Sequence, residues 1–407
     1  MATIHNKKKT VAVFFGGQSI EHDVSILTGL QIMDSLDPSL YEILPVYVAT
    51  NGAWYTGDLL RNKSSYALTN HALRQLTKIQ LPLGQIGRPF LEATETSGLF
   101  GKRQSYGFDI AFPAFHGTFG EDGSIQGAFE FAHIPFVGSG AMASSSFMNK
   151  NHTKFVAHAL GIPVLPATII HKPQDGLLDV TALARQAMFS LNFPVCAKPN
   201  NLGSSVGVHK CNSETELATA FSDIFKLDDA ALIEPFVENL VEYNIAVCRA
   251  FDEKETAFSA IERPVRQAEL LNFQDKYLQG GAGDSKINTS EGMASATRVI
   301  HPTELSQAHK DNLRGWAAAL FSALNGRGTA RIDFLCNSAT AEIWLNEINP
   351  IPGSLAYFLW QQAEKPISFP QLLNGLIEEG WREHQKRQRL SDPRYANAQV
   401  FKRAASA

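Results

Sequence analysis

Residues 193–210 read FPVCAKPNNLGSSVGVHK. A short apolar run ends at Lys198, and a loop with two glycines and two serines then leads into a second apolar stretch. Glycine lets backbone N–H groups approach an anion closely, because no Cβ stands in the way. The stretch therefore predicts two strands joined by a phosphate-binding loop, with the Lys198 ammonium group near the same anion. The alternative is an ordinary hairpin loop with a lysine that reaches solvent.

The composition of the whole chain is that of a globular protein with more than one domain. It has 407 residues, of which 44% are hydrophobic and 19% are charged, and its formal net charge is −4. This balance argues against a nucleic-acid or membrane-surface partner, and no apolar run approaches membrane-spanning length. The four cysteines lack a metal-like CxxC spacing, which is typical of a reducing compartment. We therefore expect a cytoplasmic enzyme that acts on small molecules.

The first part of the chain alternates between strand and helix patterns. VAVFF at 11–15 is typical of a fully buried strand, and a turn and an amphipathic helix follow over 16–36. Further strand patterns lie at 41–50 and 108–117. Such alternation predicts a parallel sheet with helices on both faces, so we expect an α/β domain over residues 1–150.

Two further units follow, over residues 151–245 and 246–407. The first combines helix patterns with short strand patterns, which predicts a small α+β module. The second contains a polar loop at 279–298 with four glycines. A loop of that length inside a compact domain is often a lid over a site.

Two strand patterns in the last unit carry a candidate metal site. ARIDFLC places Arg331 and Asp333 on one face of a strand, and WLNEINPIPG places Glu347 and Asn349 on one face of another. If the strands pair antiparallel across the turn at 337–341, three oxygen-bearing side chains meet, and Mg²⁺ prefers such ligands. The alternative is that these are solvated strand residues, but charged groups in apolar strands need partners. Arg331 would suit a developing oxyanion or a transferring phosphate.

The N-terminal unit contributes polar residues at the ends of its elements. Glu21 lies where a glycine-rich turn enters a helix, and it either caps the turn or holds an ammonium group of a substrate. His116 follows a strand pattern, with Glu121 and Asp122 close behind. Ligands of open α/β sheets bind outside such strand ends, although His116 could equally be a structural histidine.

Two other nucleotide-binding signatures fail. The GxxxxGK[ST] loop is absent, and the GSGAMA stretch at 138–143 only partly matches a dinucleotide-binding fingerprint. That fingerprint requires an acidic residue about twenty positions on, but no Asp or Glu lies between Glu130 and Asp175. An oxidoreductase is therefore not expected.

The chain resembles the D-alanine–D-alanine ligases of the ATP-grasp superfamily. The matching stretches occur in the family's order, and their combination is specific where each alone is only suggestive. The resemblance implies an α/β fold, in which a parallel-sheet domain precedes an ATP-grasp fold of two α+β lobes. The stretches are FFGGQSIEHDVSILTG (14–29), FHGTFGEDGSIQGAFEFAHIPFVGSGAMAS (115–144), KPNNLGSSVGVHK (198–210), DKYLQGG (275–281), ARIDF (330–334) and NEINPIPG (346–353).

The resemblance also implies where ATP and metal bind. ATP would lie between the last two units, with two Mg²⁺ ions, or Mn²⁺ in their place, held by Asp333, Glu347 and Asn349. The ATP-binding residues implied are Lys150, Lys198 and Ser205 at the phosphates, Glu234, Phe236 and Val237 at adenine, Glu242 at ribose, and Lys276 beside the nucleotide.

The implied reaction has two steps. The carboxylate of a first D-alanine attacks the γ-phosphorus of ATP, and the amine of a second then displaces phosphate from the acyl phosphate. A lid would exclude water, because water hydrolyses an acyl phosphate. The reaction would supply peptidoglycan precursors, and the family resemblance also implies a homodimer. The implied residues are Glu21 at the first ammonium group, Arg331 and the N–H of Gly353 at the oxyanion, Ser204 and Tyr277 in a network with Glu21, and His116 and Ser354 near substrate.

The chain departs from the usual family pattern at one position that bears on specificity. Many members carry a serine five residues past the PG glycine, where it holds the carboxylate of the second substrate, but here that position is Phe358. Ser354 could take over from a neighbouring position. The alternative function is the same chemistry with another second substrate, such as a hydroxy acid or another amino acid. A non-catalytic nucleotide binder is disfavoured, because the residues expected for phosphoryl transfer are all present.

Overall fold

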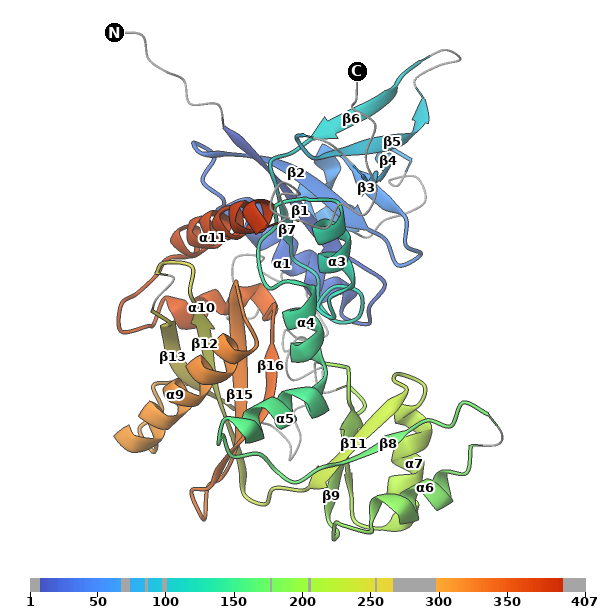
Figure 1. The fold of residues 1–407 in the computed structure, drawn as a ribbon, viewed down its shortest axis with the longest axis vertical. Helices are drawn as coiled ribbons and strands as arrows, with labels where there is room; N and C mark the ends of the chain where they lie inside the picture. Colours follow the sequence, from blue (N-terminus) through green and yellow to red (C-terminus); the bar gives the residue numbers. More distant parts are fainter. Residues whose placement is uncertain are drawn as a thin grey trace, which may run out of the picture.

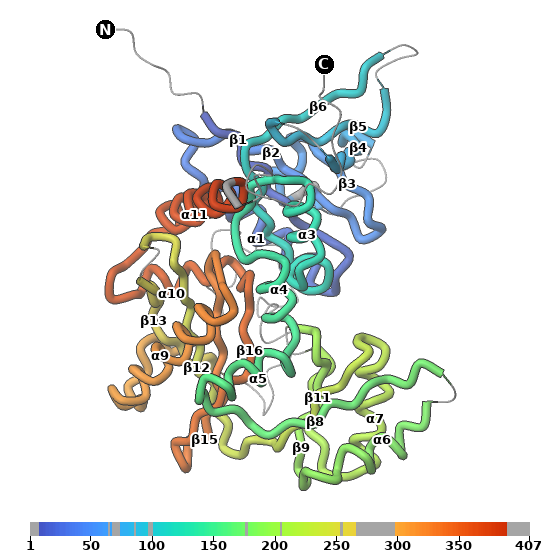
Figure 2. Tube along the Cα trace, viewed as in Figure 1, coloured from blue at the N-terminus to red at the C-terminus, as the bar shows by residue number. Residues whose placement is uncertain are grey.

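The computed structural model shows an N-terminal sheet above two further sheets that lie side by side (Figure 1). The same three bodies can be followed along the chain in Figure 2, where the helices α4 (Ala141–Met148) and α5 (Lys150–Ala159) run from the first sheet to the other two. The structure describes residues 8–66, 74–84, 87–96, 101–175, 178–203, 206–252, 255–265 and 298–390.

The N-terminal sheet has seven strands in the order β6-β5-β4-β3-β2-β1-β7. The expected parallel pairing is confirmed where β1 pairs with β2 and β7. The rest of the sheet corrects the expectation, because β2 to β6 pair antiparallel, as short strands in a meander do. The strands are β1 (Lys9–Gly16), β2 (Tyr41–Val48), β3 (Trp54–Thr56), β4 (Thr77–Gln80), β5 (Phe90–Thr96), β6 (Arg103–Gly107) and β7 (Ile110–Pro113), and two 3-10 turns, Asp58–Arg61 and Lys63–Tyr66, lie between β3 and β4.

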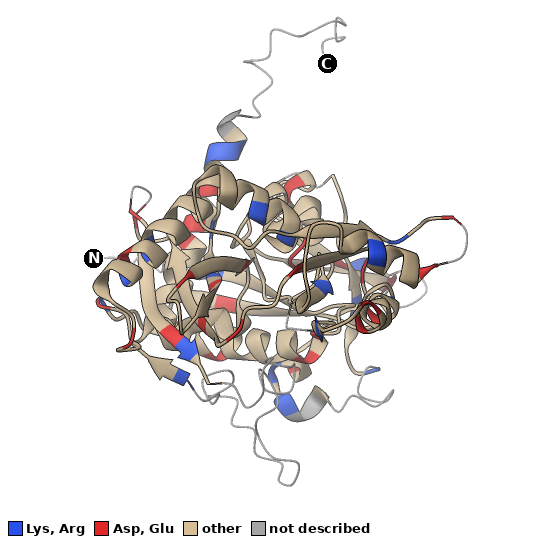
Figure 3. Cartoon of the chain, turned by 90° about the horizontal axis from the view of Figure 1, so that it is seen from below, with Lys and Arg blue, Asp and Glu red and all other residues tan. Residues whose placement is uncertain are grey.

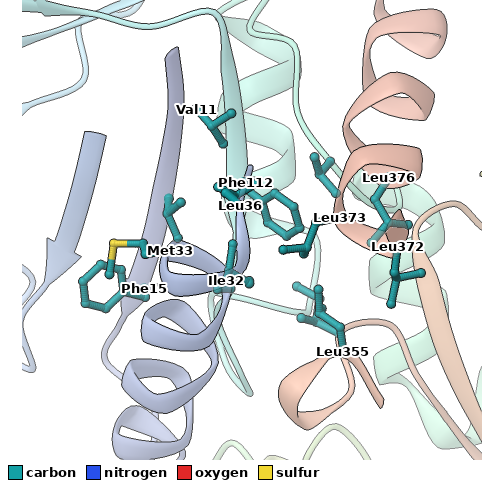
Figure 4. Packing of buried hydrophobic residues seen from close by; sticks show 14 of the residues in the cluster. Val11, Phe15, Ile32, Met33, Leu36, Phe112, Leu355, Leu372, Leu373 and Leu376 are labelled. Atoms are coloured by element: carbon teal, nitrogen blue, oxygen red, sulfur yellow. The ribbon is translucent and has the colours of Figure 1, made fainter. Parts of the chain in front are cut away.

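Strand β1 is central because both of its faces are apolar. Val11 and Phe15 pack into one cluster with α1 (His22–Ser35) and α11 (Phe369–Leu390), as Figure 4 shows. Phe14 points to the other face, where its ring lies edge-on against that of Phe129 on α3 (Ser124–Phe131). The C-terminal helix α11 therefore returns to the N-terminal sheet and closes its core.

The second sheet has four antiparallel strands in the order β10-β9-β11-β8 and its own core. The helix α7 (Glu214–Ile224) is capped at its N-terminus by the Ser213 hydroxyl, which accepts the N–H of Glu216. The other elements are β8 (Thr168–His171), β9 (Val195–Pro199), β10 (His209–Cys211), β11 (Ala230–Pro235) and α6 (Val180–Ala187).

The third sheet has five antiparallel strands in the order β14-β13-β12-β15-β16. One face packs on α4, α5 and α9 (Gln307–Ala323), whose side chains share a core with Ile245 and Ile332. The opposite face carries Asn244, Arg331 and Asp333, because side chains alternate along a strand. The strands are β12 (Leu240–Cys248), β13 (Ala257–Pro264), β14 (Arg298–Ile300), β15 (Thr329–Asn337) and β16 (Ile343–Asn349), followed by the short turn η4 (Gly353–Ala356) and α10 (Tyr357–Trp360).

The charged residues do not separate by sign along the chain. Figure 3 shows Lys and Arg interspersed with Asp and Glu over the helices and strands in that view. Within the described ranges, no helix is both long enough and apolar enough to cross a membrane.

Candidate active site

The larger of two adjoining clefts lies between the four-stranded and the five-stranded sheets. It has an empty volume of about 720 Å³. Strands β9 and β11 line one side of it, and β15 and β16 line the other. Of the residues expected at ATP or metal, those that line this cleft are Lys150, Lys198, Glu234, Phe236, Val237, Glu242, Asp333 and Glu347.

Lys198 points into this cleft and away from solvent. Its side chain is buried, and its Nζ lies 2.5 Å from Oε1 of Glu234 and 2.9 Å from Oδ1 of Asn346. Strands β9 and β10 do form an antiparallel hairpin. The alternative of a lysine reaching solvent is nevertheless wrong, because Lys198 is only 5% exposed.

Glu234 is shared between two lysines. Its other oxygen, Oε2, lies 2.7 Å from Nζ of Lys154 on α5. Burial alone would raise the pKa of Glu234, but Lys154 and Lys198 lower it to about 2, so the carboxylate is ionised. Burial opposes the charge of Lys198, yet Glu234 raises its pKa above the ordinary value. Burial lowers the pKa of Lys154, although Glu234 opposes this shift. The Lys198 ammonium group beside Glu234 is a donor of the kind that binds phosphate oxygens.

The first turn of α5 holds the loop that leaves β9. The Lys150 N–H donates to the carbonyl of Asn200 at 3.0 Å, and the Asn149 amide donates to Oδ1 of Asn201 at 2.8 Å. Nζ of Lys150 lies 2.5 Å from the carbonyl oxygen of Leu202 and 3.0 Å from Oε2 of Glu347. Lys150 therefore connects the glycine-serine loop to the carboxylate on β16.

The antiparallel pairing expected for the two C-terminal strands is confirmed. Asp333 is opposite Glu347 in the register of β15 and β16, and Arg331 is opposite Asn349. The Arg331 guanidinium contacts the Asp333 carboxylate with Nε at 2.7 Å and a terminal nitrogen at 2.6 Å. The Asn349 amide donates to the same carboxylate at 3.1 Å.

A β-bulge in β16 brings an additional side chain into the cleft. The register shifts immediately after Asp333, and Asn346 is the extra residue on β16. Regular alternation would point Asn346 and Glu347 to opposite faces. With the bulge, Asn346 accepts from Lys198 while Glu347 contacts Lys150.

The donor set suits a hard divalent cation whose remaining ligands come from substrate. Within the described residues, no group of three or more His, Cys, Asp and Glu side chains could hold a metal ion. Asp333 and Glu347 supply two carboxylates, and Asn349 supplies an amide oxygen, which Mg²⁺ accepts together with phosphate oxygens. These residues fit Mg²⁺ that arrives with a nucleotide.

The second cleft lies against the N-terminal sheet and shares Lys150 and Glu347 with the first. Its empty volume is about 460 Å³. It is smaller and more polar, as a site for amino acids would be. Of the residues expected at the reacting amino acids, those that line it are Glu21, His116, Arg331 and Gly353. Asn349, which was expected at the metal, lines this cleft as well.

Glu21 is buried in this second cleft beside two glycines. Gly117 has φ of +74°, and a Cβ on it would lie 2.6 Å from Oε2 of Glu21. A Cβ on Gly203 would lie 3.7 Å from the same atom. The loop after β9 therefore reaches the carboxylate of Glu21, so the N-terminal unit and the phosphate loop meet here.

Glu121 and Thr28 connect the pocket walls. The Glu121 carboxylate accepts the N–H of Gly117 at 2.7 Å and that of Ile351 at 3.1 Å. Burial and the neighbouring Glu21 raise the pKa of Glu121 well above its ordinary value. The Thr28 hydroxyl lies 2.8 Å from Nε2 of His116, whose pKa burial lowers to about 4, so His116 is neutral.

The turn after Gly353 is buried and unusual in its backbone. Ser354, Leu355 and Ala356 have φ of 53°, 52° and 51°, in the left-handed region. The Ser354 N–H donates to the Thr28 hydroxyl at 3.2 Å. This turn leads directly into α10, where Phe358 is buried.

Three residues of the site were not expected from the sequence. Lys154 could have been found from its spacing, since it lies one helical turn after Lys150 and on the same face. Asn346 depends on the bulge and has no sequence signal that we recognise. Thr28 lies on the buried face of α1. Four expected residues lie outside the described ranges, together with loop residues 279–297: Ser204, Ser205, Lys276 and Tyr277.

The fold and the two clefts define an ATP-dependent ligase of the ATP-grasp type. The structure is similar to that of a D-alanine-D-alanine ligase from Coxiella burnetii, with a TM-score of 0.74 and 26% identity over 94% of this chain and 97% of that one. It also shares its fold with a D-Ala:D-Ser ligase from Enterococcus faecalis, with a TM-score of 0.70 and 23% identity over 92% of this chain and 100% of that one.

The chain belongs to the D-alanine–D-alanine ligase family. The family model for the D-ala D-ala ligase N-terminus matches residues 10–139, and that for the C-terminus matches residues 156–378. A D-alanine–D-alanine ligase A from Bradyrhizobium diazoefficiens is 31% identical over 94% of this chain and 98% of its own length. A D-alanine–D-alanine ligase from Chloroherpeton thalassium is 32% identical over 92% and 96%. The resemblance inferred from the motifs is therefore confirmed.

Proposed function

We propose that this chain joins two D-alanine molecules through a D-alanyl phosphate, with ATP converted to ADP and phosphate, and that the dipeptide serves peptidoglycan precursor synthesis. The observation that carries the proposal is the continuity of the two clefts. Lys150 and Glu347 line both, so a γ-phosphate held by one cleft would lie beside a carboxylate held by the other.

We propose that ATP binds in the larger cleft. The positive charge around Lys198 suits its phosphates, and the apolar wall suits adenine. Glu234 would act mainly through the two lysines that it orients. The assignments are Lys150, Lys198 and Ser205 at the phosphates, Glu234, Phe236 and Val237 toward adenine, Glu242 at ribose and Lys276 beside the nucleotide.

Asp333, Glu347 and Asn349 would hold two Mg²⁺ ions, with Mn²⁺ able to replace them. When bound, the metal neutralises charge on the phosphate oxygens during transfer. Asp333 would then exchange its contact with Arg331 for the metal, which frees the guanidinium for substrate.

The amino acids would react in the smaller cleft. Glu21 would hold the ammonium group of the first D-alanine, whose carboxylate oxygen attacks the γ-phosphorus as ADP leaves. The second amine then attacks the acyl carbon, loses a proton, and expels phosphate with the attacking oxygen. Arg331 and the Gly353 N–H would stabilise the tetrahedral oxyanion. Ser204 and Tyr277 would complete a network with Glu21. His116 and Ser354 would shape the pocket, and the loop expected at 279–298 would exclude water.

We propose three domains, with the expected boundary at residue 150 kept and the expected boundary at residue 245 moved toward the N-terminus. The separate core of the four-stranded sheet supports a central lobe. The second boundary would lie before Leu240 rather than at residue 245, because β12 belongs to the five-stranded sheet. We also propose that the protein is a homodimer, which analytical ultracentrifugation tests. Its proposed location is the cytoplasm, where ATP is available.

The test is phosphate release from Mg-ATP across D- and L-amino acids and hydroxy acids, singly and in pairs, with the product identified by mass. We expect release with D-alanine alone and a product with the mass of D-alanyl-D-alanine. Release no higher than from ATP alone would contradict the proposal.

A second candidate is the same chemistry with a different second substrate. Phe358 favours it, because a buried aromatic ring replaces the hydroxyl that many family members place there. In the same panel, this candidate predicts product only when D-alanine is paired with another amino acid or a hydroxy acid.

A further inference from the structure

A second arginine whose side chain is only 11% exposed, Arg298, lies on the same face of the five-stranded sheet as Arg331. Arg298 begins β14, and its guanidinium carbon lies 3.8 Å from the centre of the Phe358 ring. A terminal nitrogen of the same guanidinium lies 2.7 Å from Oε2 of Glu262 on β13. The ring and the carboxylate fix the position and orientation of this guanidinium.

Arg298 lies at the end of a polar row that begins at the proposed metal site. In the strand register, Glu262 is opposite Asn244, and Asn244 is opposite Asp333. The Asn244 amide donates to Oε1 of Glu262 at 3.2 Å. The row crosses β13, β12 and β15 on the face opposite to α9, where the phosphoryl-transfer residues also lie.

Two features of this row indicate a polar ligand. Asn244 is only 4% exposed, and its Oδ1 has no hydrogen-bond partner within the described residues, so it suits the amine of an amino acid. Burial lowers the pKa of Arg298, and the charge of Arg331 acts in the same direction. Two guanidinium groups on side chains that are each 11% exposed, and that affect each other, are stabilised by an anion between them.

The turn after Gly353 links the amino-acid cleft to the helix that carries Phe358, the partner of Arg298. Gly353 lines the amino-acid cleft, and α10 begins four residues later. Helix α10 packs against β12 and β13, as Figure 1 shows. Phe358, whose ring contacts Arg298, therefore lies only a few residues along the chain from Gly353, the proposed oxyanion donor.

We propose that Arg298, supported by Phe358 and Glu262, binds the carboxylate of the second substrate and so selects an α-amino or α-hydroxy acid at that position. This inference rests on the proposed function. A guanidinium binds a carboxylate through two parallel hydrogen bonds. Arg298 can therefore bind the substrate carboxylate in place of the serine hydroxyl that many family members carry at the position of Phe358.

The test compares two second substrates, D-alanine and D-alaninamide, at a fixed concentration of D-alanine in the first site. D-alaninamide has no carboxylate to phosphorylate, so it can act only as the second substrate. We expect wild-type kcat/KM for the acid to exceed that for the amide at least 30-fold. R298M should reduce this ratio to about one and leave the KM for ATP within about threefold, and R298K should give an intermediate ratio.

The control is R263M, which removes a neighbouring arginine on β13 whose partner is Glu304, and it should keep the wild-type ratio. E262Q is the second variant if R298M does not fold, and it should lower the ratio by loosening Arg298. A wild-type ratio retained in R298M, or in E262Q and R298K together, would overturn the proposal. Wild-type protein could instead accept only a different acid as the second substrate, which would contradict the proposed function without testing Arg298. The same comparison, made between that acid and its amide, then decides the role of Arg298.

Discussion

At the scale of single residues, the site depends on buried charges whose partners hold them in place. Lys198, Asp333 and Glu347 could be predicted because charged residues inside apolar strands need a reason to be there. Lys154 was not predicted, although its spacing from Lys150 gave a signal. Asn346 could not be predicted, because its direction depends on a bulge that no sequence pattern specifies.

Replacing Lys198 by alanine should raise the KM for ATP at least tenfold. The change removes an ammonium group from the phosphate side of the cleft and leaves Glu234 with Lys154 alone. Steady-state kinetics with varied ATP measures it. K226A, at an exposed lysine paired with Asp223, should behave as wild type, and an unchanged KM in K198A would remove Lys198 from the nucleotide site.

Replacing Glu347 by glutamine should reduce kcat at least 100-fold with a much smaller effect on nucleotide affinity. A neutral amide is a weak metal ligand, so it stabilises the charge that develops in transfer less well. Turnover and calorimetric titration with ADP separate the two effects. E342Q, on the exposed turn before β16, is the control. Wild-type turnover in E347Q would contradict the metal assignment.

At the scale of elements, the long apolar strands were predictable and the short polar ones were not. Strand β1 and the pair β15 and β16 have clear apolar patterns, and the structure confirms them. Strands β3, β4 and β6 have only three to five residues, and β6 has no buried residue, so their alternation gives little signal. The apolar segment at 134–138 forms only an isolated bridge from Phe136 to Ala111.

The junction of α11 with β15 should make stability depend on pH. Glu379 accepts the N–H of Gly328 at 2.7 Å, and burial raises the pKa of Glu379 to about 7. In the unfolded chain this carboxyl ionises near pH 4.5. The contribution of protonated Glu379 to the free energy of unfolding is therefore complete below pH 4.5 and is lost as pH rises through 7. The loss amounts to about 3 kcal/mol.

Urea unfolding at pH 5 and pH 8 measures this effect. E379Q keeps the acceptor oxygen but cannot ionise. It should therefore lose about 2–3 kcal/mol less than wild type between pH 5 and pH 8, because part of the total loss already occurs below pH 5. E378Q, at a half-exposed neighbour, should follow wild type. Parallel pH curves for wild type and E379Q would show that Glu379 is ionised in the folded protein.

At the scale of the whole molecule, the four-stranded lobe is the most independent part. Its core contains only residues of its own sheet and helices, whereas the core around β1 also includes residues of β12, η4, α10 and α11. The sequence predicted a change of pattern near residue 150 but could not show that the last helix returns to the first sheet, because such long-range packing leaves no local periodicity.

F221A should therefore unfold the central lobe before the rest. Phe221 is fully buried in that lobe, and its truncation should cost about 3–5 kcal/mol. All five tryptophans lie outside residues 151–235, so their fluorescence reports on the remainder. In urea, ATP binding should be lost at a lower concentration than in wild type while the fluorescence midpoint stays. A joint shift of both would indicate one cooperative unit.

We propose that residues of the two clefts transfer the γ-phosphoryl group of ATP to the carboxylate of an amino acid. D-alanine labelled with ¹⁸O in both carboxylate oxygens tests it, with phosphate and nucleotide products analysed by mass. Acyl phosphate formation predicts one ¹⁸O in each inorganic phosphate and none in the nucleotide. Unlabelled phosphate accompanying dipeptide, or label in AMP, would contradict the claim.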